Sequence, residues 1–176
     1  EADGVTVYNA RCKEVLAAGL VPVREVKLIH ADPPYGVNER TDRKSKGRSL
    51  AAGGGVRVLG TTAQRSHDWP AIVGDSEAYD PAPLLALERP TVLWGANHYS
   101  ERVPGSPSWI LWDKREFTTP DDNADGELAW SNLGGPLRIF RHWWRGALRK
   151  TEKVEGHLHP TQKPIALSAY VFERAK

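Results

Sequence analysis

The sequence predicts an α/β fold in which helices cover the faces of one sheet. Short apolar runs of strand length are separated by segments that favour helices or loops, and this alternation is typical of α/β proteins. The chain has 176 residues, of which 40% are hydrophobic and 7 are Trp. Because that composition is enough to build the core of one domain, we expect a single domain over residues 1–176.

The first elements lead to an unusual tetrapeptide. Residues 4–9 alternate in polarity as a strand does, and residues 11–18 contain good helix formers up to Gly19, a typical helix stop. Residues 27–31 are mostly apolar and predict a second strand. This strand must end at Asp32-Pro33-Pro34-Tyr35, the DPPY turn, because proline cannot donate to the hydrogen-bond ladder.

A long loop follows the DPPY turn. Residues 38–66 combine a basic run with the triplet Gly53-Gly54-Gly55 and many small polar residues. This composition offers little to bury and much backbone freedom, so we expect a mobile loop.

The second half of the chain supplies the remaining elements. Residues 81–87 predict a short helix capped by Asp80, with proline in its first turn. A helix that begins at a proline is predicted over residues 164–175. Further strands are predicted at residues 91–94, which Gly95 closes, at residues 108–112 and at residues 137–144.

Composition excludes several classes of protein. No apolar run approaches the roughly 20 residues that span a bilayer, so no membrane partner is expected. Cys12 is the one cysteine, which excludes an internal disulfide and fits a reducing, cytoplasmic compartment. Neither Cys12 nor the histidines His142, His157 and His159 show metal-ligand spacing, so we expect no metal.

Charge is distributed in blocks. Residues 39–67 hold 7 Lys and Arg against 2 acids, and residues 131–176 hold 9 against 3, whereas residues 68–130 hold 4 against 12. The two basic blocks could form one phosphate-facing groove if the fold brings them together, or they could be ordinary solvated surface.

The DPPY turn suits the handling of an amine. Ligands of open α/β sheets bind beyond the carboxyl ends of strands, where this turn is expected. Prolines have no N–H, so the turn offers oxygens and few donors. The Asp32 carboxylate and the Pro33 carbonyl could each accept one hydrogen of an exocyclic amine and localise its lone pair, while Tyr35 could stack on the base. Simple turn formation is the alternative.

The DPPY turn resembles the hallmark of DNA amino-methyltransferases, which act on adenine N6 or cytosine N4. Residues 159–164 (His159-Pro160-Thr161-Gln162-Lys163-Pro164) look like the HPTQKP element that follows the catalytic motif in the permuted classes of this family. Residues 90–115, with their Trp-Gly-x-Asn-His pattern, are similar to small phage-type members of restriction-modification enzymes.

The resemblance implies a Rossmann-like methyltransferase fold that uses S-adenosylmethionine and acts on a base flipped out of double-stranded DNA. The implied catalytic residues are Asp32, Pro33, Pro34 and Tyr35. The implied cofactor-binding residues are Asp32, His159, Pro160, Thr161, Gln162, Lys163 and Pro164. The basic loop would place Arg40, Arg43, Lys44, Lys46 and Arg48 on DNA phosphates.

An aspartate at the first position of the motif favours adenine N6 as the target, with N4-cytosine as the alternative. The family's glycine-rich cofactor turn is not recognisable, because Gly53-Gly54-Gly55 follows no apolar strand, and Arg11 stands where relatives often carry an acid. We therefore expect a partial methyltransferase domain, truncated before that turn. A DNA-binding relative without cofactor is the second hypothesis.

Three tryptophans and two aspartates each have a functional and a structural interpretation. Trp130, Trp143 and Trp144 could stack on bases, but aromatic residues of a small domain are more often core. Asp75 and Asp113 could line the pocket, although exposed acids in turns are commoner.

Overall fold

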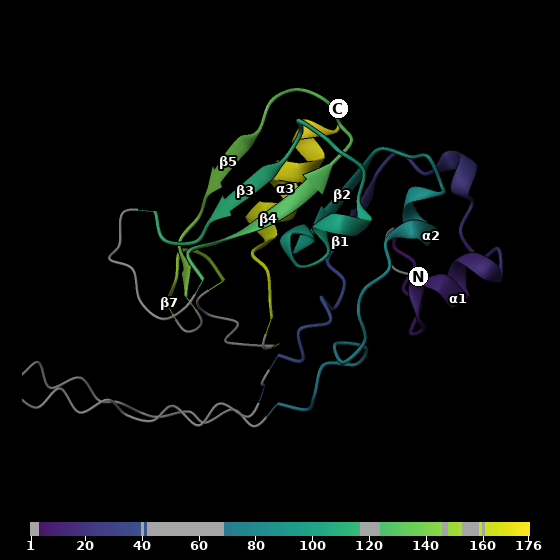
Figure 1. Ribbon diagram of the computed structural model, residues 1–176, viewed down its shortest axis with the longest axis horizontal. Coiled ribbons are helices and arrows are strands. Elements are labelled where there is room, and N and C mark those ends of the chain that lie inside the picture. Colours follow the sequence, from purple (N-terminus) through teal and green to yellow (C-terminus); the bar gives the residue numbers. More distant parts are fainter. Residues whose placement is uncertain are drawn as a thin grey trace, which may run out of the picture.

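The computed structural model describes residues 4–39, 41, 69–116, 124–145, 148–152, 159 and 161–176. In these residues the fold is an α/β arrangement built on a mixed five-stranded sheet of order β1-β2-β4-β3-β5 (Figure 1). The strands are β1 (Ile29–Ala31), β2 (Thr91–Trp94), β3 (Ile110–Asp113), β4 (Gly126–Ser131) and β5 (Arg138–Arg141). A separate two-stranded sheet pairs β6 (Trp144–Arg145) with β7 (Leu148–Arg149).

Strand β4 runs against all the others. It pairs antiparallel with β2, placing Trp94 opposite Ala129, and antiparallel with β3, placing Trp112 opposite Glu127. The β1–β2 and β3–β5 pairs are parallel. The carboxyl ends of β1, β2 and β3 therefore meet at one edge of the sheet, and β4 begins at that same edge.

Helices pack on the sheet and its loops. Three α-helices are present in the described residues: α1 (Cys12–Ala17), α2 (Ala82–Leu85) and α3 (Ile165–Arg174). Short 3₁₀ turns form η1 (Val23–Glu25), η2 (Ala96–His98) and η3 (Ser100–Arg102).

The core divides into two clusters because strand side chains alternate between the two faces of a sheet. On one face Val92 and Trp94 pack with Leu167 and Val171 of α3. On the other face Leu93 joins a cluster that includes Leu84 of α2, Ala96, Tyr99 and Trp130. Each face of β2 is thus covered, and all four of its residues are buried.

Most predicted elements are confirmed. The helices predicted at residues 11–18, 81–87 and 164–175 correspond to α1, α2 and α3, and the strands predicted at residues 27–31, 91–94 and 108–112 to β1, β2 and β3. Gly95 closes β2 with φ +69°. The N-cap of α2 is Pro81 rather than the predicted Asp80, whose carboxylate lies one residue earlier and accepts the N–H of Ala82.

One predicted strand is wrong, one is confirmed only over part of its length, and one strand was not predicted. Residues 4–9 form no strand but only an isolated bridge at Val5, and Val7 is 86% exposed. The strand predicted at residues 137–144 ends at Arg141, and β6 begins only at Trp144. Strand β4 lay outside every prediction, although it pairs with both β2 and β3. Of the loop predicted at residues 38–66, all but residues 38, 39 and 41 lie outside the described part of the chain.

Candidate functional site

The DPPY turn lies where the sequence predicted it. Asp32 follows β1 directly, and β1 runs parallel to β2, so the turn is at the carboxyl edge of the sheet. This is the edge at which α/β proteins commonly bind ligands.

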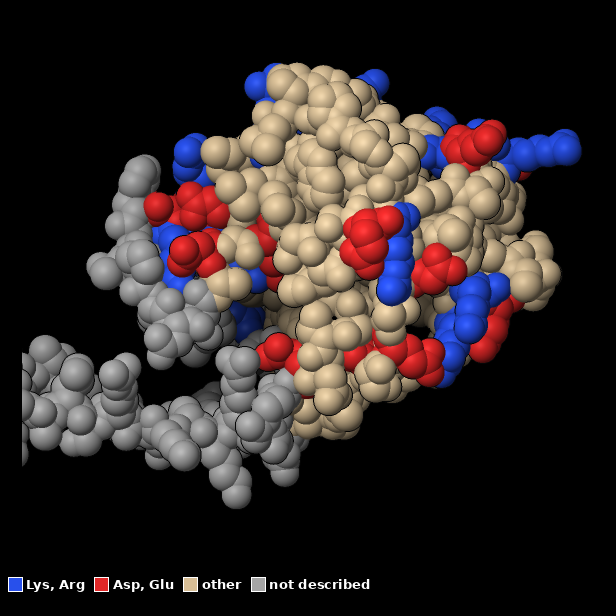
Figure 2. Space-filling model, in the orientation of Figure 1, with Lys and Arg blue, Asp and Glu red and all other residues tan. Residues whose placement is uncertain are grey.

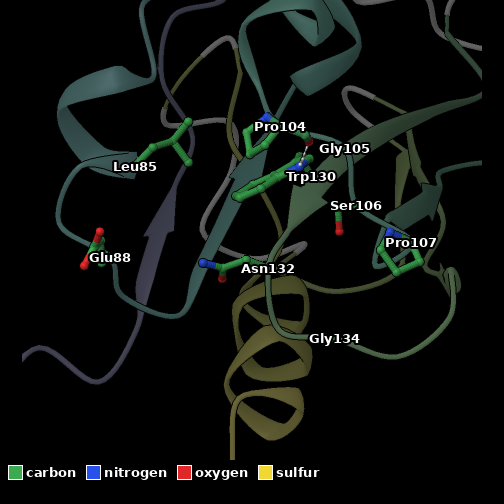
Figure 3. A pocket seen from close by; sticks show the side chains of 9 residues that line it. All are labelled: Leu85, Glu88, Pro104, Gly105, Ser106, Pro107, Trp130, Asn132 and Gly134. Carbon is green, nitrogen blue, oxygen red and sulfur yellow. Dashed lines mark hydrogen bonds between the residues drawn. The ribbon is translucent and has the colours of Figure 1, made fainter.

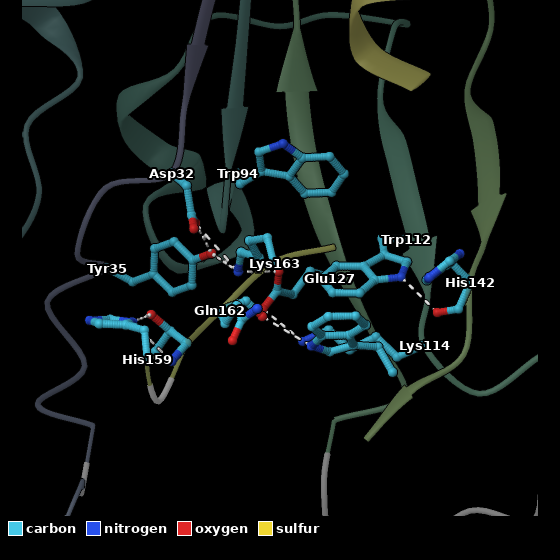
Figure 4. Close-up of polar contacts among 12 residues, drawn as sticks. Asp32, Tyr35, Trp94, Trp112, Lys114, Glu127, His142, His159, Gln162 and Lys163 are labelled. Atoms are coloured by element: carbon cyan, nitrogen blue, oxygen red, sulfur yellow. Dashed lines mark hydrogen bonds and ion pairs between the residues drawn. The ribbon is translucent and has the colours of Figure 1, made fainter. Parts of the chain in front are cut away.

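Lys163 of the HPTQKP element reaches the DPPY turn (Figure 4). Its ammonium nitrogen donates to the Tyr35 hydroxyl oxygen at 3.1 Å and lies 3.4 Å from Asp32 Oδ1. The Tyr35 hydroxyl in turn donates to the same Oδ1 at 2.7 Å. The two motifs that the sequence analysis singled out therefore meet in one polar cluster, and both contacts use a single oxygen of Asp32.

Glu127 of β4 completes this cluster. Its Oε2 accepts a hydrogen bond of 2.6 Å from Lys163, and its Oε1 accepts one of 2.7 Å from Lys114, which follows β3. The three side chains are only 16–19% exposed. With Asp32 they make a balanced group of two carboxylates and two ammonium groups, which lowers the cost of holding charge away from water.

The pKa values in the cluster follow from burial and from these pairs. Burial lowers the pKa of Lys114, although the Glu127 carboxylate opposes the shift. Burial by itself would raise the pKa of Glu127, but the ammonium groups of Lys163 and Lys114 outweigh it, and the net shift is downward. Burial and the nearby Glu127 and Asp32 charges raise the pKa of Tyr35, so its hydroxyl remains a proton donor.

Trp112 forms an aromatic surface beneath the two lysines. The Lys114 nitrogen lies 4.6 Å from the centre of the Trp112 ring and the Lys163 nitrogen 5.8 Å from it. The indole is fully buried and its N–H donates to the carbonyl of His142. Because Trp112 stands opposite Glu127 in the β3–β4 pair, the sheet register itself sets this arrangement.

The Tyr35 ring is held between backbone and imidazole. It stacks on His98 with ring centres 5.2 Å apart and planes 14° from parallel. A Cβ added to Gly95 would overlap the Tyr35 ring, so only glycine permits this approach. A base that stacks on the face of Tyr35 now covered by His98 would have to displace that imidazole.

Asp75 fixes the backbone after the DPPY turn. Its Oδ1 accepts the N–H groups of Gly36 at 2.9 Å and Val37 at 3.3 Å, and its Oδ2 accepts that of Glu39 at 2.6 Å. Asp75 is 4% exposed, so it is a buried anchor rather than a solvated turn residue.

Other residues of the HPTQKP element pack against β6 and β7. The indole N–H of Trp144 donates to the Gln162 carbonyl at 3.0 Å, and Arg149 donates to the Gln162 side-chain oxygen at 3.2 Å. The exposed His159 accepts the N–H of Thr161 through its ring nitrogen, and the buried Pro164 begins α3. Pro160 lies outside the described residues.

The structure does not bear on the predicted DNA-contacting residues. Arg40, Arg43, Lys44, Lys46, Arg48 and the Gly53-Gly54-Gly55 triplet all lie outside the described part of the chain. In the second basic block, Arg141 pairs with Asp113 and Lys150 with Glu116. Figure 2 shows acidic and basic side chains side by side on the face in view.

The tryptophans weighed as base-stacking residues differ in burial. Trp130 is 2% exposed in the core, and Trp144 is 7% exposed beneath Arg149. Trp143 is half-buried. Trp130 also borders a groove of about 480 Å³, which it shares with Pro104 and Asn132 at the opposite edge of the sheet (Figure 3).

Sequence reasoning missed Glu127, the stacking of His98 on Tyr35 and the anchoring role of Asp75. Lys114 was detectable, because a polar residue directly after an apolar strand faces the carboxyl edge of the sheet. Glu127 gave no comparable signal, since β4 was not predicted and reaches the edge with its amino end.

Comparison with known proteins adds no relative: no protein family, curated protein or solved structure matches the chain. Within the described residues, no cluster of His, Cys, Asp or Glu has the arrangement of a metal site. None of the described helices could cross a bilayer as an apolar span.

Proposed function

We propose that this chain orients the target amine in a DNA methyltransferase of Rossmann-like fold, which moves a methyl group from S-adenosylmethionine to adenine N6. One observation carries the proposal: Lys163 of HPTQKP contacts both Asp32 and Tyr35 of the DPPY turn. Both motifs are recognisable in the sequence alone. Two unrelated turns would not be expected to contact each other in the folded chain.

The chemistry of the DPPY turn fits an aromatic amine. Such an amine is a weak nucleophile because its lone pair is delocalised into the ring. Asp32 would accept one amine hydrogen and the Pro33 carbonyl the other, which favours a pyramidal nitrogen with a localised lone pair. With the Asp32 Oδ1 already engaged by Tyr35 and Lys163, we assign the amine to Oδ2.

The donor set also fits the methyl donor. Bound S-adenosylmethionine supplies an electrophilic methyl group on a sulfonium, together with an amino-acid end that carries an ammonium and a carboxylate. Ammonium and carboxylate side chains lie side by side in the cluster of Asp32, Glu127 and Lys163, which matches that pair of charges. Because both oxygens of Asp32 are already assigned, we place the carboxylate of this amino-acid end on Lys163.

A second candidate is a DNA-binding relative that has no cofactor. Side chains of the HPTQKP element bind other residues of the same chain rather than facing solvent, since Lys163 pairs with Glu127 and Gln162 with Arg149. These contacts favour the second candidate. N4-cytosine methylation differs from the first candidate only in the base that the DPPY turn receives.

Calorimetry with S-adenosylmethionine separates the two candidates. We expect binding in the wild-type chain, weakened by Lys163→Met and unchanged by Glu173→Gln, an exposed acid-to-amide control on α3 whose ion pair is with Lys176. Absence of heat at millimolar cofactor would reject the enzyme assignment for this chain and leave the cofactor-free candidate.

Transfer of tritiated methyl to unmethylated DNA then tests the chemistry. We expect incorporation that Asp32→Ala abolishes, and activity that survives this substitution would contradict the role of Asp32. Digestion of the product to nucleosides shows whether adenine or cytosine carries the label.

A further inference from the structure

Glu127 bridges two ammonium groups, and one of them also borders Asp32. Lys163 lies 2.6 Å from Glu127 Oε2 but 3.4 Å from Asp32 Oδ1, so it makes the shorter contact with Glu127. The other oxygen of Glu127 holds Lys114 at 2.7 Å. Two carboxylates therefore compete for Lys163, and Glu127 holds it.

Removal of this competitor has a predictable effect on Asp32. Without the Glu127 charge, Lys114 and Lys163 would repel each other across the space that the carboxylate occupied. Among the described residues, the other carboxylate in contact with Lys163 is Asp32, whose side chain is 34% exposed. A Lys163 no longer held by Glu127 would move from Oδ1 across both oxygens of Asp32 and so occupy Oδ2, the oxygen assigned to the amine.

We propose that Glu127 is a positioning residue that restrains Lys163 and so leaves Asp32 available to accept an exocyclic amine. The inference rests on the proposed function, because it specifies how the amine-binding carboxylate is kept open. Glu127 acts through Lys163 and does not itself touch the base.

The surroundings of Glu127 support this role. Its place at the start of β4, opposite Trp112, fixes its backbone against β3. The two neighbouring ammonium groups lower its pKa in spite of burial, so the charge that restrains Lys163 persists at neutral pH. Lys114 serves as the second attachment point and keeps the carboxylate from following Lys163.

The test compares 2′-deoxyadenosine with purine 2′-deoxyriboside, which has a hydrogen in place of the amine and keeps N1 as an acceptor. Equilibrium dialysis measures the ratio of their dissociation constants, which isolates recognition of the amine. A hydrogen bond to a charged acceptor predicts that the wild-type chain prefers deoxyadenosine by about tenfold or more. Glu127→Gln should reduce this preference to about twofold or less, whereas Glu173→Gln on α3 should leave it unchanged.

The double variant Glu127→Gln with Lys163→Met distinguishes restraint from simple packing. If Glu127 acts by holding Lys163, removal of Lys163 frees Asp32 and restores the preference. If Glu127 only supports the fold, the double variant binds no better than Glu127→Gln, and the inference is overturned. If circular dichroism shows that Glu127→Gln does not fold, Glu127→Asp replaces it. The aspartate side chain is one methylene shorter and lies farther from Lys163, so this variant must also lower the preference for deoxyadenosine.

Asp32→Ala makes the two possible failures distinguishable. A wild-type chain with no preference for deoxyadenosine contradicts the proposed function itself. A preference that disappears in Asp32→Ala but persists in Glu127→Gln contradicts only the role of Glu127.

Discussion

The ammonium nitrogen of Lys163 lies 3.4 Å from the Oδ1 of Asp32, although the two residues are near opposite ends of the chain. The contact forms because α3, which begins after Pro164, packs on the sheet face that carries Trp94 and Trp112. The segment before α3 is thereby delivered to the carboxyl edge of the sheet. The long-range contact is thus a product of helix packing.

We predict that Lys163 is coupled more strongly to Glu127 than to Asp32. The Glu127 pair is short and largely buried, so a double-mutant cycle with Lys163→Met and Glu127→Gln should give a coupling energy of about 1–3 kcal/mol. The corresponding cycle with Asp32→Asn should give about 0.5 kcal/mol, because Asp32 is partly exposed. Urea denaturation measures both cycles, and equal coupling energies would show that the ammonium is shared evenly.

Asp75→Ala should destabilise the loop that follows the DPPY turn. Three backbone N–H groups would lose a charged acceptor, and we expect the free energy of unfolding to fall by about 2–4 kcal/mol. Asp75→Asn keeps one acceptor oxygen and should cost about half as much. Chemical denaturation compares the two variants, and a loss below about 0.5 kcal/mol for Asp75→Ala would mean that the anchor is dispensable.

Gly95→Ala should be costly because the added methyl would enter the Tyr35 ring. Gly134 provides a matched control, since its φ is +78° but no atom lies within 4 Å of an added Cβ. The left-handed backbone alone should cost about 1 kcal/mol in Gly134→Ala, whereas Gly95→Ala adds a steric clash and should cost about 2–4 kcal/mol. Thermal denaturation of both variants checks the difference, and similar losses would contradict the packing of Tyr35 on Gly95.

His30 should make stability depend on pH. Burial lowers its pKa below the ordinary 6.5, although Asp32 opposes the shift, and its Nε2 accepts the indole N–H of Trp94 at 2.8 Å. Because the folded-state pKa is the lower one, this contribution is complete above about pH 6.5 and is lost as the pH falls towards the folded-state value.

The matched variant is His30→Gln, which keeps an acceptor for Trp94 but does not titrate. Between about pH 7.5 and pH 5, urea denaturation should show a larger loss of stability in the wild-type chain than in this variant. Burial also lowers the pKa of His142, but His142 is present in both proteins, so the difference reports His30 alone. Parallel pH curves for the two proteins would exclude a neutral, buried His30.

Local sequence patterns were sufficient for the elements that flank the site. Proline residues predicted the end of β1 and the start of α3, because proline fixes φ and has no N–H to donate. Gly95 predicted the end of β2, because glycine permits a left-handed backbone. Strand β4 was different. Its reversed direction and its place between β2 and β3 depend on partners elsewhere in the chain, which no window of its own residues contains.

The residues of the candidate site likewise fall into two groups, those predicted from local motifs and those whose roles depend on distant contacts. Asp32 and Lys163 were identified from motifs, and the structure brings them together. Glu127 and Asp75 act through contacts with residues far away in sequence, so their roles became visible only in three dimensions. Acidic side chains are usually solvated, and the sequence alone does not distinguish Glu127 and Asp75 from the other acidic residues of the chain.

The direction of β4 also constrains how the sheet can assemble. A shift of its pairing by one residue would move Glu127 to the opposite face and separate Lys114 and Lys163 from the carboxylate that bridges them. The same shift would move Trp130 out of its own cluster. The charges that serve the site therefore also penalise misaligned strand pairing. The proposed chemistry and the correct pairing of β4 therefore both require Glu127 to lie on the face of the sheet that carries the two lysines.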